Sequence, residues 1–263
     1  QVANRPVYVA IGVNLDGERD VLGLWLGPTG GEGAKQWMSM LTDLRKKLEP
    51  VGRLDALDVV GQRALKYYAG QKPGDLDADA LGRRSRALHL VGEVRDLRGD
   101  SEGALAGFRQ AAATTAELLA RDPGNAQRIF DHAQSAYWVG FIAYQRGQEQ
   151  EAEARFREYR RLADRLVQLD SGNPDRQMEV SYAERNLGPL ISDPGRYSEA
   201  EQVFTKALHV SEMLARQSPG NVHRQIDVAR SMSWLANTLD RQERIEPALA
   251  VYHRELAIYR QIL

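Results

Sequence analysis

The sequence predicts a mainly α-helical solenoid of antiparallel helix pairs, preceded by a short β-hairpin and a single helix. The prediction depends on three kinds of residue that recur every 48 positions. They are an alanine, an aromatic ring four residues after it, and a small residue twelve residues before it. The three series are Ala104, Ala152, Ala200 and Ala248; Phe108, Phe156, Phe204 and Tyr252; and Gly92, Gly140, Gly188 and Ala236. A fixed period of this size is typical of a repeat array, in which stacked units cover one another's apolar faces.

Turn residues divide the chain at the same period. One set follows the second helix of each expected pair: Gly124, Gly172 and Gly220. A second set separates the two helices of a pair: Gly99, Gly147 and Gly195, with Glu243 at the fourth place. Glycine just past a helix end fits a left-handed cap, and the asparagine beside the first set can begin the next helix. The predicted units are 76–124, 125–172, 173–220 and 221–263, with a leading helix over 54–70.

The recurring small residues suggest how the helices pack. A glycine or alanine at a helix crossing lets two helices approach closely, and we expect the aromatic ring to fill the gap between successive units. In the last unit a stripe with helical spacing runs along one face: Ala248, Tyr252, Leu256, Tyr259 and Leu263. Pro189 should kink or end the first helix of the third unit.

The first fifty residues have a different pattern. Residues 6–13 and 21–26 are β-branched and apolar, and Asp16-Gly17 between them is a strong hairpin signal. Residues 34–47 then show helical spacing, with Trp37, Met40 and Leu41 on one face. Two strands and one helix are too few to form a stable core alone. We therefore predict a separate segment over 1–50 and a helical repeat domain over 51–263.

The composition excludes several classes of protein. The chain has 263 residues, a net charge of -1 and no cysteine. Disulfides and thiolate metal sites are therefore excluded, and the balanced charge gives no attraction toward nucleic acid or anionic membranes. No apolar run approaches the roughly 20 residues that span a bilayer, and no signal-peptide pattern is present. We expect a cytoplasmic protein, and Gln1 in place of an initiator methionine suggests a fragment or a processed product.

Three local patterns invite functional readings that the residues do not favour. The glycine-rich stretch 27–35 lacks the Gly-Lys-Ser/Thr order of a phosphate-binding loop, since Ala34 separates Gly33 from Lys35. Acidic residues at the hairpin tip are ordinary turn residues: Asp16, Glu18 and Asp20. The histidines show no helical metal-ligand spacing: His89, His132, His209, His223 and His253. We expect no metal, no cofactor and no small-molecule substrate.

One helix is rich in charges of both signs. Its arginines are Arg155, Arg157, Arg160, Arg161 and Arg165, and its acidic residues are Glu151, Glu153, Glu158 and Asp164. Mixed charges of this kind favour a solvated face with pairs four residues apart, rather than a nucleic-acid-binding stripe.

The repeat half resembles the tetratricopeptide (TPR) family, whose pattern places Leu-Gly in the first helix and Ala-x3-Phe in the second. Here the first element is Val91-Gly92, Val139-Gly140, Leu187-Gly188 and Leu235-Ala236, and the second is the alanine and aromatic series above. The match covers roughly 190 residues, but the period of 48 exceeds the family's usual value of about 34, which implies longer helices.

The resemblance implies a concave groove lined by the first helix of each unit, and a protein or peptide partner. The candidate partner-binding residues are Arg86, His89, Tyr137, Phe141, Tyr144, Tyr182, Arg185 and Arg230, with Glu93 and Asn237 as further groove positions. Aromatic residues and arginine dominate the energetics of interfaces. The alternative for Phe141 and Tyr144 is that they are core residues between units, and for His89 that it is solvated or half-buried.

Residues 5–17, 21–27 and 32–37 resemble the catalytic core of Mutator-family bacterial transposases, over about residues 4–45. The resemblance implies two strands and a helix of an RNase H-like domain. That family cleaves and transfers DNA with three metal-binding carboxylates, whose segments are missing here, and no acidic residue of the hairpin matches them. The first fifty residues therefore resemble an inactive transposase remnant, joined near Lys46 to the repeats by an insertion element or by misassembly.

These observations predict a non-catalytic protein–protein interaction scaffold that binds a peptide or protein in its groove. The alternative is a Mutator-family transposase that binds and recombines DNA, predicted to be inactive.

Overall fold

The computed structural model describes residues 7–13, 19–26, 46, 62, 74 and 76–262. The chain divides into two compact units, Gln1–Pro123 and Gly124–Leu263. The predicted turn at Asp16-Gly17, the predicted helices over 34–47 and 54–70 and the glycine-rich stretch 27–35 lie outside the described residues, apart from single positions.

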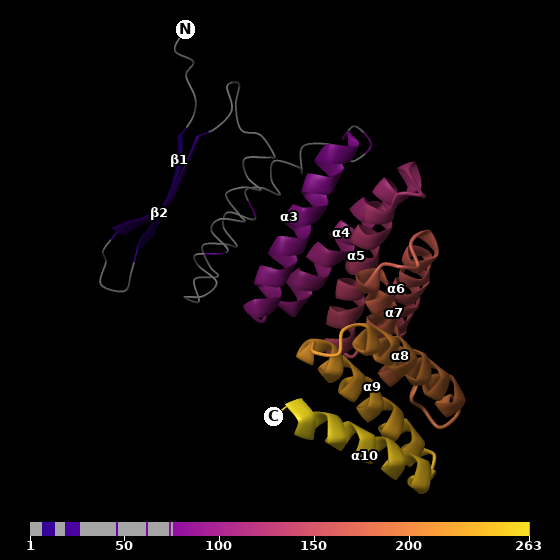
Figure 1. Ribbon diagram of the computed structural model, residues 1–263. Helices are drawn as coiled ribbons and strands as arrows, with labels where there is room; N and C mark the ends of the chain where they lie inside the picture. Colours follow the sequence, from indigo (N-terminus) through magenta and orange to yellow (C-terminus); the bar gives the residue numbers. More distant parts are fainter. Residues whose placement is uncertain are drawn as a thin grey trace. The chain divides into compact units, whose positions relative to one another are not determined.

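In the first unit, two strands form an antiparallel hairpin (Figure 1). Strand β1 (Val7–Val13) pairs with β2 (Arg19–Leu26), and the register places Val7 opposite Leu26. The register shifts between Ala10 and Ile11.

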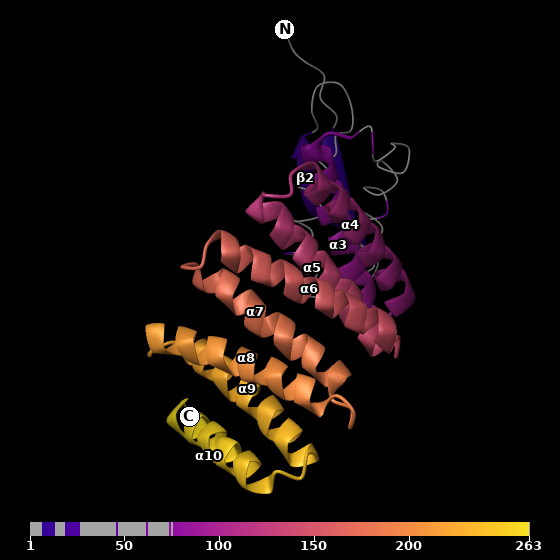
Figure 2. The same cartoon turned by 90° about the vertical axis from the view of Figure 1, so that its right-hand side faces the viewer.

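All other elements over 76–262 are helical, and consecutive helices pack as pairs (Figure 2). The first unit holds one pair, α3 (Ala78–Leu97) and α4 (Ser101–Arg121). The second unit holds three pairs: α5 (Ala126–Gln145) with α6 (Glu149–Leu169); α7 (Pro174–Leu187) and the 3₁₀ turn η2 (Gly188–Ile191) with α8 (Tyr197–Gln217); and α9 (Val222–Arg241) with α10 (Ile245–Ile262). The first helices begin at 78, 126, 174 and 222, so the 48-residue spacing of the sequence is the spacing of the pairs.

The asparagines between pairs cap the next helix, as predicted. The side chains of Asn125, Asn173 and Asn221 accept hydrogen bonds from backbone N–H groups in the first turns of α5, α7 and α9. The expectation of left-handed caps at Gly124, Gly172 and Gly220 is wrong, because none of these glycines has a positive φ. The preceding helices end instead at residues with negative φ, such as Asp122 (φ -151°) and Asp170 (φ -158°).

The left-handed turns lie inside the pairs. Gly99 and Gly147 have φ values of 80° and 70°, just past the ends of α3 and α5. Glu243 takes the same conformation after α9, with a φ of 61°, although its side chain makes the left-handed region costly. The left-handed turn is therefore present in the fourth pair, even though glutamate replaces the glycine there.

The recurring rings pack against the recurring glycines of their own pair. A Cβ atom added to Gly92, Gly140 or Gly188 would lie 2.9, 2.8 or 2.1 Å from the nearest ring atom of Phe108, Phe156 or Phe204. Each ring therefore packs first within its own pair, and Phe204 also stacks on Trp234 of the next pair, as expected for a ring that lies between units. The missing side chain on one helix makes the space that the ring on the other helix occupies.

The fourth ring differs from the other three. Phe108, Phe156 and Phe204 are buried, but Tyr252 is only half-buried on α10, the last described helix. The four recurring rings therefore do not occupy equivalently buried places, although they recur at the same interval in the sequence. Six α8 positions that are buried have counterparts 48 residues later on α10 that are half-buried or exposed: Val203, Phe204, Ala207, Leu208, Ser211 and Leu214.

A continuous apolar cluster joins the three pairs of the second unit. It begins at Ala143 on α5, includes Phe156, Leu187 and Phe204, and ends at Ala248 on α10. Helix α6 packs against α7, and α8 packs against α9, so each pair contacts the next. Burying these faces supplies most of the stabilisation of such an array, since non-polar burial contributes about 25 cal/mol per Å².

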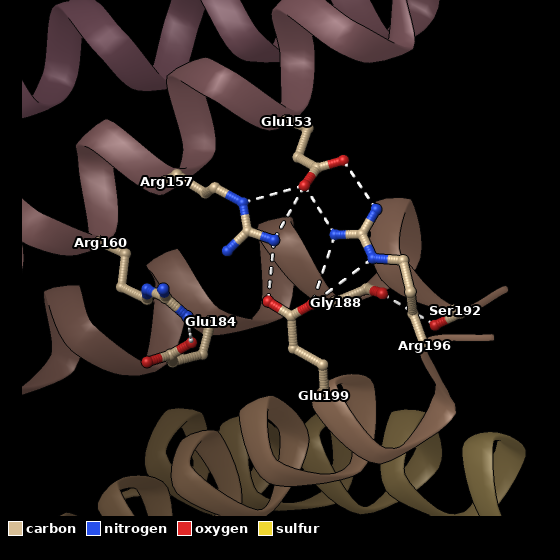
Figure 3. Close-up of polar contacts among 8 residues, drawn as sticks. All are labelled: Glu153, Arg157, Arg160, Glu184, Gly188, Ser192, Arg196 and Glu199. Carbon is tan, nitrogen blue, oxygen red and sulfur yellow. Dashed lines mark hydrogen bonds and ion pairs between the residues drawn. The ribbon is translucent and has the colours of Figure 1, made fainter.

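Ion pairs also bridge successive pairs, and Figure 3 shows the largest group. Arg196 donates to both carboxylate oxygens of Glu153 on α6, at 2.9 and 2.6 Å, and Arg157 Nη2 lies 2.8 Å from Glu199 on α8. The hydrogen bond from Arg196 and the bonds from Arg157 lower the pKa of Glu153 to about 2. The charged helix α6 therefore has pairs four residues apart, as predicted, but its arginines and glutamates also hold α8.

The same bridges recur one period later. Arg244 binds Glu201 at 2.7 Å, 48 residues beyond the Arg196–Glu153 pair. Lys206 binds Asp164 at 3.0 Å, and 48 residues later Arg254 binds Glu212 at 2.6 Å. The repeat thus includes charged positions that link the second helix of one pair to the next pair.

Candidate partner-binding groove

Six of the eight predicted partner-binding residues line a single hollow of the second unit. The hollow has a volume of about 770 Å³ and lies on the first helices α5, α7 and α9. The six residues are Tyr137, Phe141, Tyr144, Tyr182, Arg185 and Arg230. We call this hollow, with its further lining residues Gln134, Phe156, Tyr159, Glu179, Asn186, Pro189 and Trp234, the aromatic hollow.

The other two predicted residues are on α3, in the first unit. Arg86 is exposed. His89 is half-buried, and its ring lies 5.5 Å from that of Phe108. Burial lowers the pKa of His89 to about 4, so its imidazole is neutral at pH 7. The half-buried alternative therefore describes His89, whose ring packs within its own helix pair.

The break in α7 accompanies the hollow. Helix α7 has 14 residues, whereas α5 and α9 each have 20. Pro189 cannot donate a backbone hydrogen bond, so the α-helix ends at Leu187 and continues as the 3₁₀ turn η2, as the sequence predicted. Pro189 lines the hollow together with residues of α5 and α9.

Aromatic rings form the α5 side of the hollow. Tyr137 and Phe141 stack with their centroids 5.8 Å apart, and Tyr137 lies 5.7 Å from Tyr159 of α6. Tyr137 and Phe141 also pack against the apolar cluster, so the core alternative for Phe141 is partly correct. Tyr144 is 48% exposed and extends the apolar wall toward solvent.

The opposite side of the hollow belongs to α9. Trp234 stacks on Phe204 with an interplanar angle of 4° and a centroid distance of 5.6 Å. It remains 41% exposed. A large aromatic ring with one face packed and much of its surface open is a ready contact for an apolar partner. The sequence analysis missed Trp234, although it lies on the same helix as Arg230 at a spacing of four.

Two arginines line the hollow, in different electrostatic situations. The guanidinium of Arg185 lies 5.1 Å above the Tyr182 ring, and its Nη1 is 3.3 Å from Asp227 Oδ1. Asp227 therefore compensates its charge. Arg230 is exposed and forms no ion pair with any residue that the structure describes. Arg185 is thus paired directly, whereas Arg230 faces the hollow without a direct ionic partner among the described residues.

The acidic lining residue, Glu179, is held by its neighbours. The Tyr159 hydroxyl donates to Glu179 Oε2 at 2.5 Å, and the Gln134 amide donates to the same oxygen at 2.9 Å. Burial raises the pKa of Glu179, against these two hydrogen bonds, which lower it. Neither Tyr159 nor Glu179 was expected at the site. The acidic residues Asp131, Glu179 and Asp227 recur every 48 positions, which is the signal that could have found one of them.

A second hollow of about 590 Å³ continues the first toward the beginnings of the same helices. It is lined by residues such as Phe130, Arg176 and Arg224, and it shares Glu179 and Tyr182 with the aromatic hollow. The two hollows together form a groove along α5, α7 and α9, which we call the first-helix groove. Its chemistry is that of binding: ring faces, amides and guanidinium groups.

Within the part of the chain that the structure describes, no group of three His, Asp or Glu side chains is placed to hold a metal ion. No helix among the described residues is long and apolar enough to cross a membrane. Asp16 and Glu18, which the sequence analysis interprets as ordinary turn residues of the hairpin tip, lie outside the described residues.

Comparison with known proteins gives two separate results. Residues 1–49 match the family "Transposase, Mutator family". Over 46 residues the chain is 44% identical to the transposase for insertion sequence element ISRM3 of Rhizobium meliloti. Over 47 residues it is 40% identical to a probable insertion-element transposase of Corynebacterium diphtheriae. These matches cover 18% of this chain, and the chain spans only 11% and 13% of the two relatives.

The rest of the similarity is structural. A Podosopora anserina putative kinesin light chain with nearly identical TPR-like repeats matches 88% of this chain and 99% of its own, with a TM-score of 0.65 and 15% identity. BtubC (BKLC) from P. vanneervenii matches 87% of this chain and 83% of its own, with a TM-score of 0.65 and 16% identity. The apo form of RapI matches 87% and 55%, with a TM-score of 0.63 and 10% identity.

The chain has a TPR-like repeat fold. At identities of 10–16% the likeness shows the fold alone. It confirms the resemblance to TPR repeats that the sequence suggested. The match of residues 1–49 to Mutator transposases agrees with the second resemblance.

Proposed function

We propose that the TPR-like array is a non-catalytic scaffold that binds a peptide or protein segment in the first-helix groove. The observation that carries the proposal is the convergence of rings and arginines on one face. Tyr144 and Trp234 are large apolar side chains left substantially exposed, and both line the same hollow. Aromatic residues and arginine are the side chains that most often dominate binding energy.

The dimensions of the groove support an extended segment as the ligand. Its two hollows are each within the range of pockets that bury a ligand, about 300–1,000 Å³, and they share Glu179 and Tyr182. A segment lying along both would contact α5, α7 and α9 at once. The groove is also built on packed helices, so its residues would lose little conformational freedom when a partner binds.

The experiment is a pull-down with the intact chain, compared with two groove variants. The first is the Tyr137→Ala/Phe141→Ala double variant, and the second is Tyr144→Ala, whose exposed ring can be removed with little effect on the core. The matched control is Leu249→Ala/Leu256→Ala, which removes two exposed apolar side chains from α10. We expect the groove variants to lose partners that the control retains. Equal recovery by all variants would refute the proposal.

The alternative function is DNA transposition, and the observation that favours it is the match of residues 1–49. We propose that the chain is inactive in this reaction, because the resemblance assigns it none of the family's carboxylates. A strand-transfer assay with Mg²⁺ or Mn²⁺ and DNA ends tests this directly. Any metal-dependent strand transfer by the purified chain would establish the alternative.

A further inference from the structure

We propose that the open face of α10 binds the same face of a second copy of this chain, so that two copies associate through antiparallel α10 helices. The surface lines neither hollow of the first-helix groove, and the inference does not depend on the proposed function. Three observations carry it. They are an exposed apolar stripe, the loss of the acidic residues that bind a following pair, and a charge pattern that matches its own reverse.

The apolar stripe runs along α10 beside its contact with α9. Helix α10 is the last helix of the second unit, and α9 packs against it (Figure 2). The residues of the stripe alternate at spacings of four and three: Ile245, Leu249, Tyr252, Leu256 and Tyr259. The isoleucine and the two leucines are 50%, 45% and 44% exposed, and the two tyrosines are half-buried. This alternation is the pattern of a coiled-coil seam, which places all five side chains along one line of the helix.

The repeat identifies this side of the helix as one that receives another helix. Two α8 residues that lie 48 positions before members of the stripe are Phe204 and Ser211. Phe204 stacks on Trp234 of α9, and the hydroxyl of Ser211 lies 3.3 Å from that of Ser231 on the same helix. The counterparts on α10 are the two tyrosines of the stripe. The stripe therefore has the position of a helix-binding surface, although no described helix covers its exposed members.

The first bridging position of α10 does not suit a further pair of the same kind. Helices α6 and α8 each hold the next pair through a glutamate near their start. Glu153 binds Arg196 at 2.6 Å, and Glu201 binds Arg244 at 2.7 Å. The residue 48 positions after Glu201 is Leu249. An arginine of a following pair would therefore meet an apolar side chain in place of a carboxylate.

The second bridging position is reversed in sign. Asp164 on α6 binds Lys206 at 3.0 Å, and Glu212 on α8 binds Arg254 at 2.6 Å. The residue 48 positions after Glu212 is Arg260. The cation with which a following pair would form this bridge would thus meet another cation. A further pair of this kind would find neither of its acidic partners on α10.

The charges beside the stripe instead match a second copy in the reverse orientation. Three exposed residues follow one another at intervals of seven along one flank of the stripe: Glu246, His253 and Arg260. Neither Glu246 nor Arg260 forms an ion pair with a residue that the structure describes. Both lie seven residues from His253. Two antiparallel helices centred on this histidine would place Glu246 of each copy opposite Arg260 of the other.

The apolar stripe fits the same register. Leu249 of one helix would lie beside Leu256 of the other, Ile245 would lie beside Tyr259, and the two Tyr252 rings would meet near the two-fold axis. The stripe is about 21 Å long, at 1.5 Å per residue. A contact through one helix face is at the small end of specific interfaces, so we expect a weak dimer. Because the contact is isologous, association stops at two copies.

The test is sedimentation velocity of the intact chain over a range of concentrations. The variants are Glu246→Arg and Arg260→Glu, and the matched control is Arg161→Glu, which reverses an exposed arginine of α6. Each single variant places like charges at both ionic contacts of the pair. An equimolar mixture of the two variants restores opposite charges at both contacts, because one chain then carries two arginines and the other two glutamates. Circular dichroism checks that each variant is folded.

We expect the apparent mass to rise from 29.4 kDa toward twice that value between about 1 µM and 0.3 mM. Each single variant should raise the dissociation constant by about ten-fold or more, because like charges then face each other. The mixture should return to within about three-fold of the wild type, and Arg161→Glu should change the constant by less than about two-fold. Leu249→Ala/Leu256→Ala should also weaken the dimer.

Three results would overturn the inference. A wild-type chain that stays monomeric at about 0.3 mM forms no such dimer. If that monomer binds a labelled peptide with the sequence of residues 222–241, the stripe receives a further first helix in place of a second copy. Self-association that both single variants retain uses another surface. Dissociation of both variants without recovery in their mixture rules out the antiparallel register. None of these results bears on the pull-down, since the groove residues are unchanged.

Discussion

The ring-on-glycine contact predicts an unusual response to a small substitution, Gly140→Ala. The added Cβ would lie 2.8 and 2.9 Å from two atoms of the Phe156 ring and 3.2 Å from Arg155 Cβ. Contacts this short force the ring or the helix to move, and overpacking of a core costs about 1–3 kcal/mol. Alanine is also a better helix former than glycine by about 1 kcal/mol. We therefore expect a net loss of about 0–2 kcal/mol in the free energy of unfolding.

The steric origin of the loss can be isolated by a double-mutant cycle. Phe156→Leu removes the ring, so Gly140→Ala made in that background should stabilise the chain by up to about 1 kcal/mol, through helix propensity alone. Gly82→Ala on α3 is the matched control, because its added Cβ would meet only Arg86 Nη1, at 3.5 Å. It should be neutral or stabilising in the wild-type background.

The assay is urea denaturation followed by far-ultraviolet circular dichroism, with hydrogen exchange to locate the effect in α5 and α6. Exchange is needed because repeat arrays unfold in parts. If Gly140→Ala changes stability equally with and without the Phe156 ring, or stabilises the wild-type chain as Gly82→Ala does, the proposed packing is wrong.

Three further predictions concern single positions. Glu243→Gly should raise the free energy of unfolding by about 0.5–1 kcal/mol, because it relieves a left-handed residue at φ 61°; a lower thermal midpoint would contradict this. Burial raises the pKa of Glu179 above its unfolded value of 4.5, so its favourable contribution is present below that value and is lost as the pH rises through the raised folded pKa. Glu179→Gln should therefore stabilise the chain near pH 7, with the gain shrinking as the pH falls through the raised folded pKa to about 4.5 in urea titrations; a gain that grows on acidification would show the opposite sign. Phe204→Leu should cost about 1–3 kcal/mol and Tyr252→Leu less than about 1 kcal/mol, since the first ring is buried and the second is half-buried; equal losses by calorimetry would disprove this difference.

The sequence predicted the helical pairs because their apolar periodicity and their turn residues agree. A recurring residue type sets the register of a repeat, and the observed helix starts follow it. The break at Pro189 was also predictable, because proline lacks a backbone N–H and its ring disrupts a helix wherever it occurs in the interior. The direction in which each ring packs was not predictable. It depends on which helix leaves a space, and Gly140 gives that space to Phe156 of its own pair.

The residues of the candidate site that the sequence predicted all lie on the first helices of the pairs. Tyr137 and Arg230 could be placed because a TPR-like groove is lined by first helices. Tyr159 could not, since it comes from the second helix α6 and reaches the hollow through its hydrogen bond to Glu179. The charge balance also needed the structure, because only geometry shows that Asp227 pairs with Arg185.

The bridges between successive second helices have a mechanical consequence. Arg196–Glu153, and its counterpart one period later, tie neighbouring pairs together through partly exposed charges. Exposed ion pairs contribute at most about 1 kcal/mol each and weaken over a Debye length of about 10 Å at 0.1 M salt. The ring-on-glycine contacts within a pair are apolar and lack this sensitivity. Added electrolyte should therefore weaken the contacts between neighbouring helix pairs while leaving the packing inside each pair unchanged. Salt would then alter the bending flexibility of the array without altering the stability of its individual units.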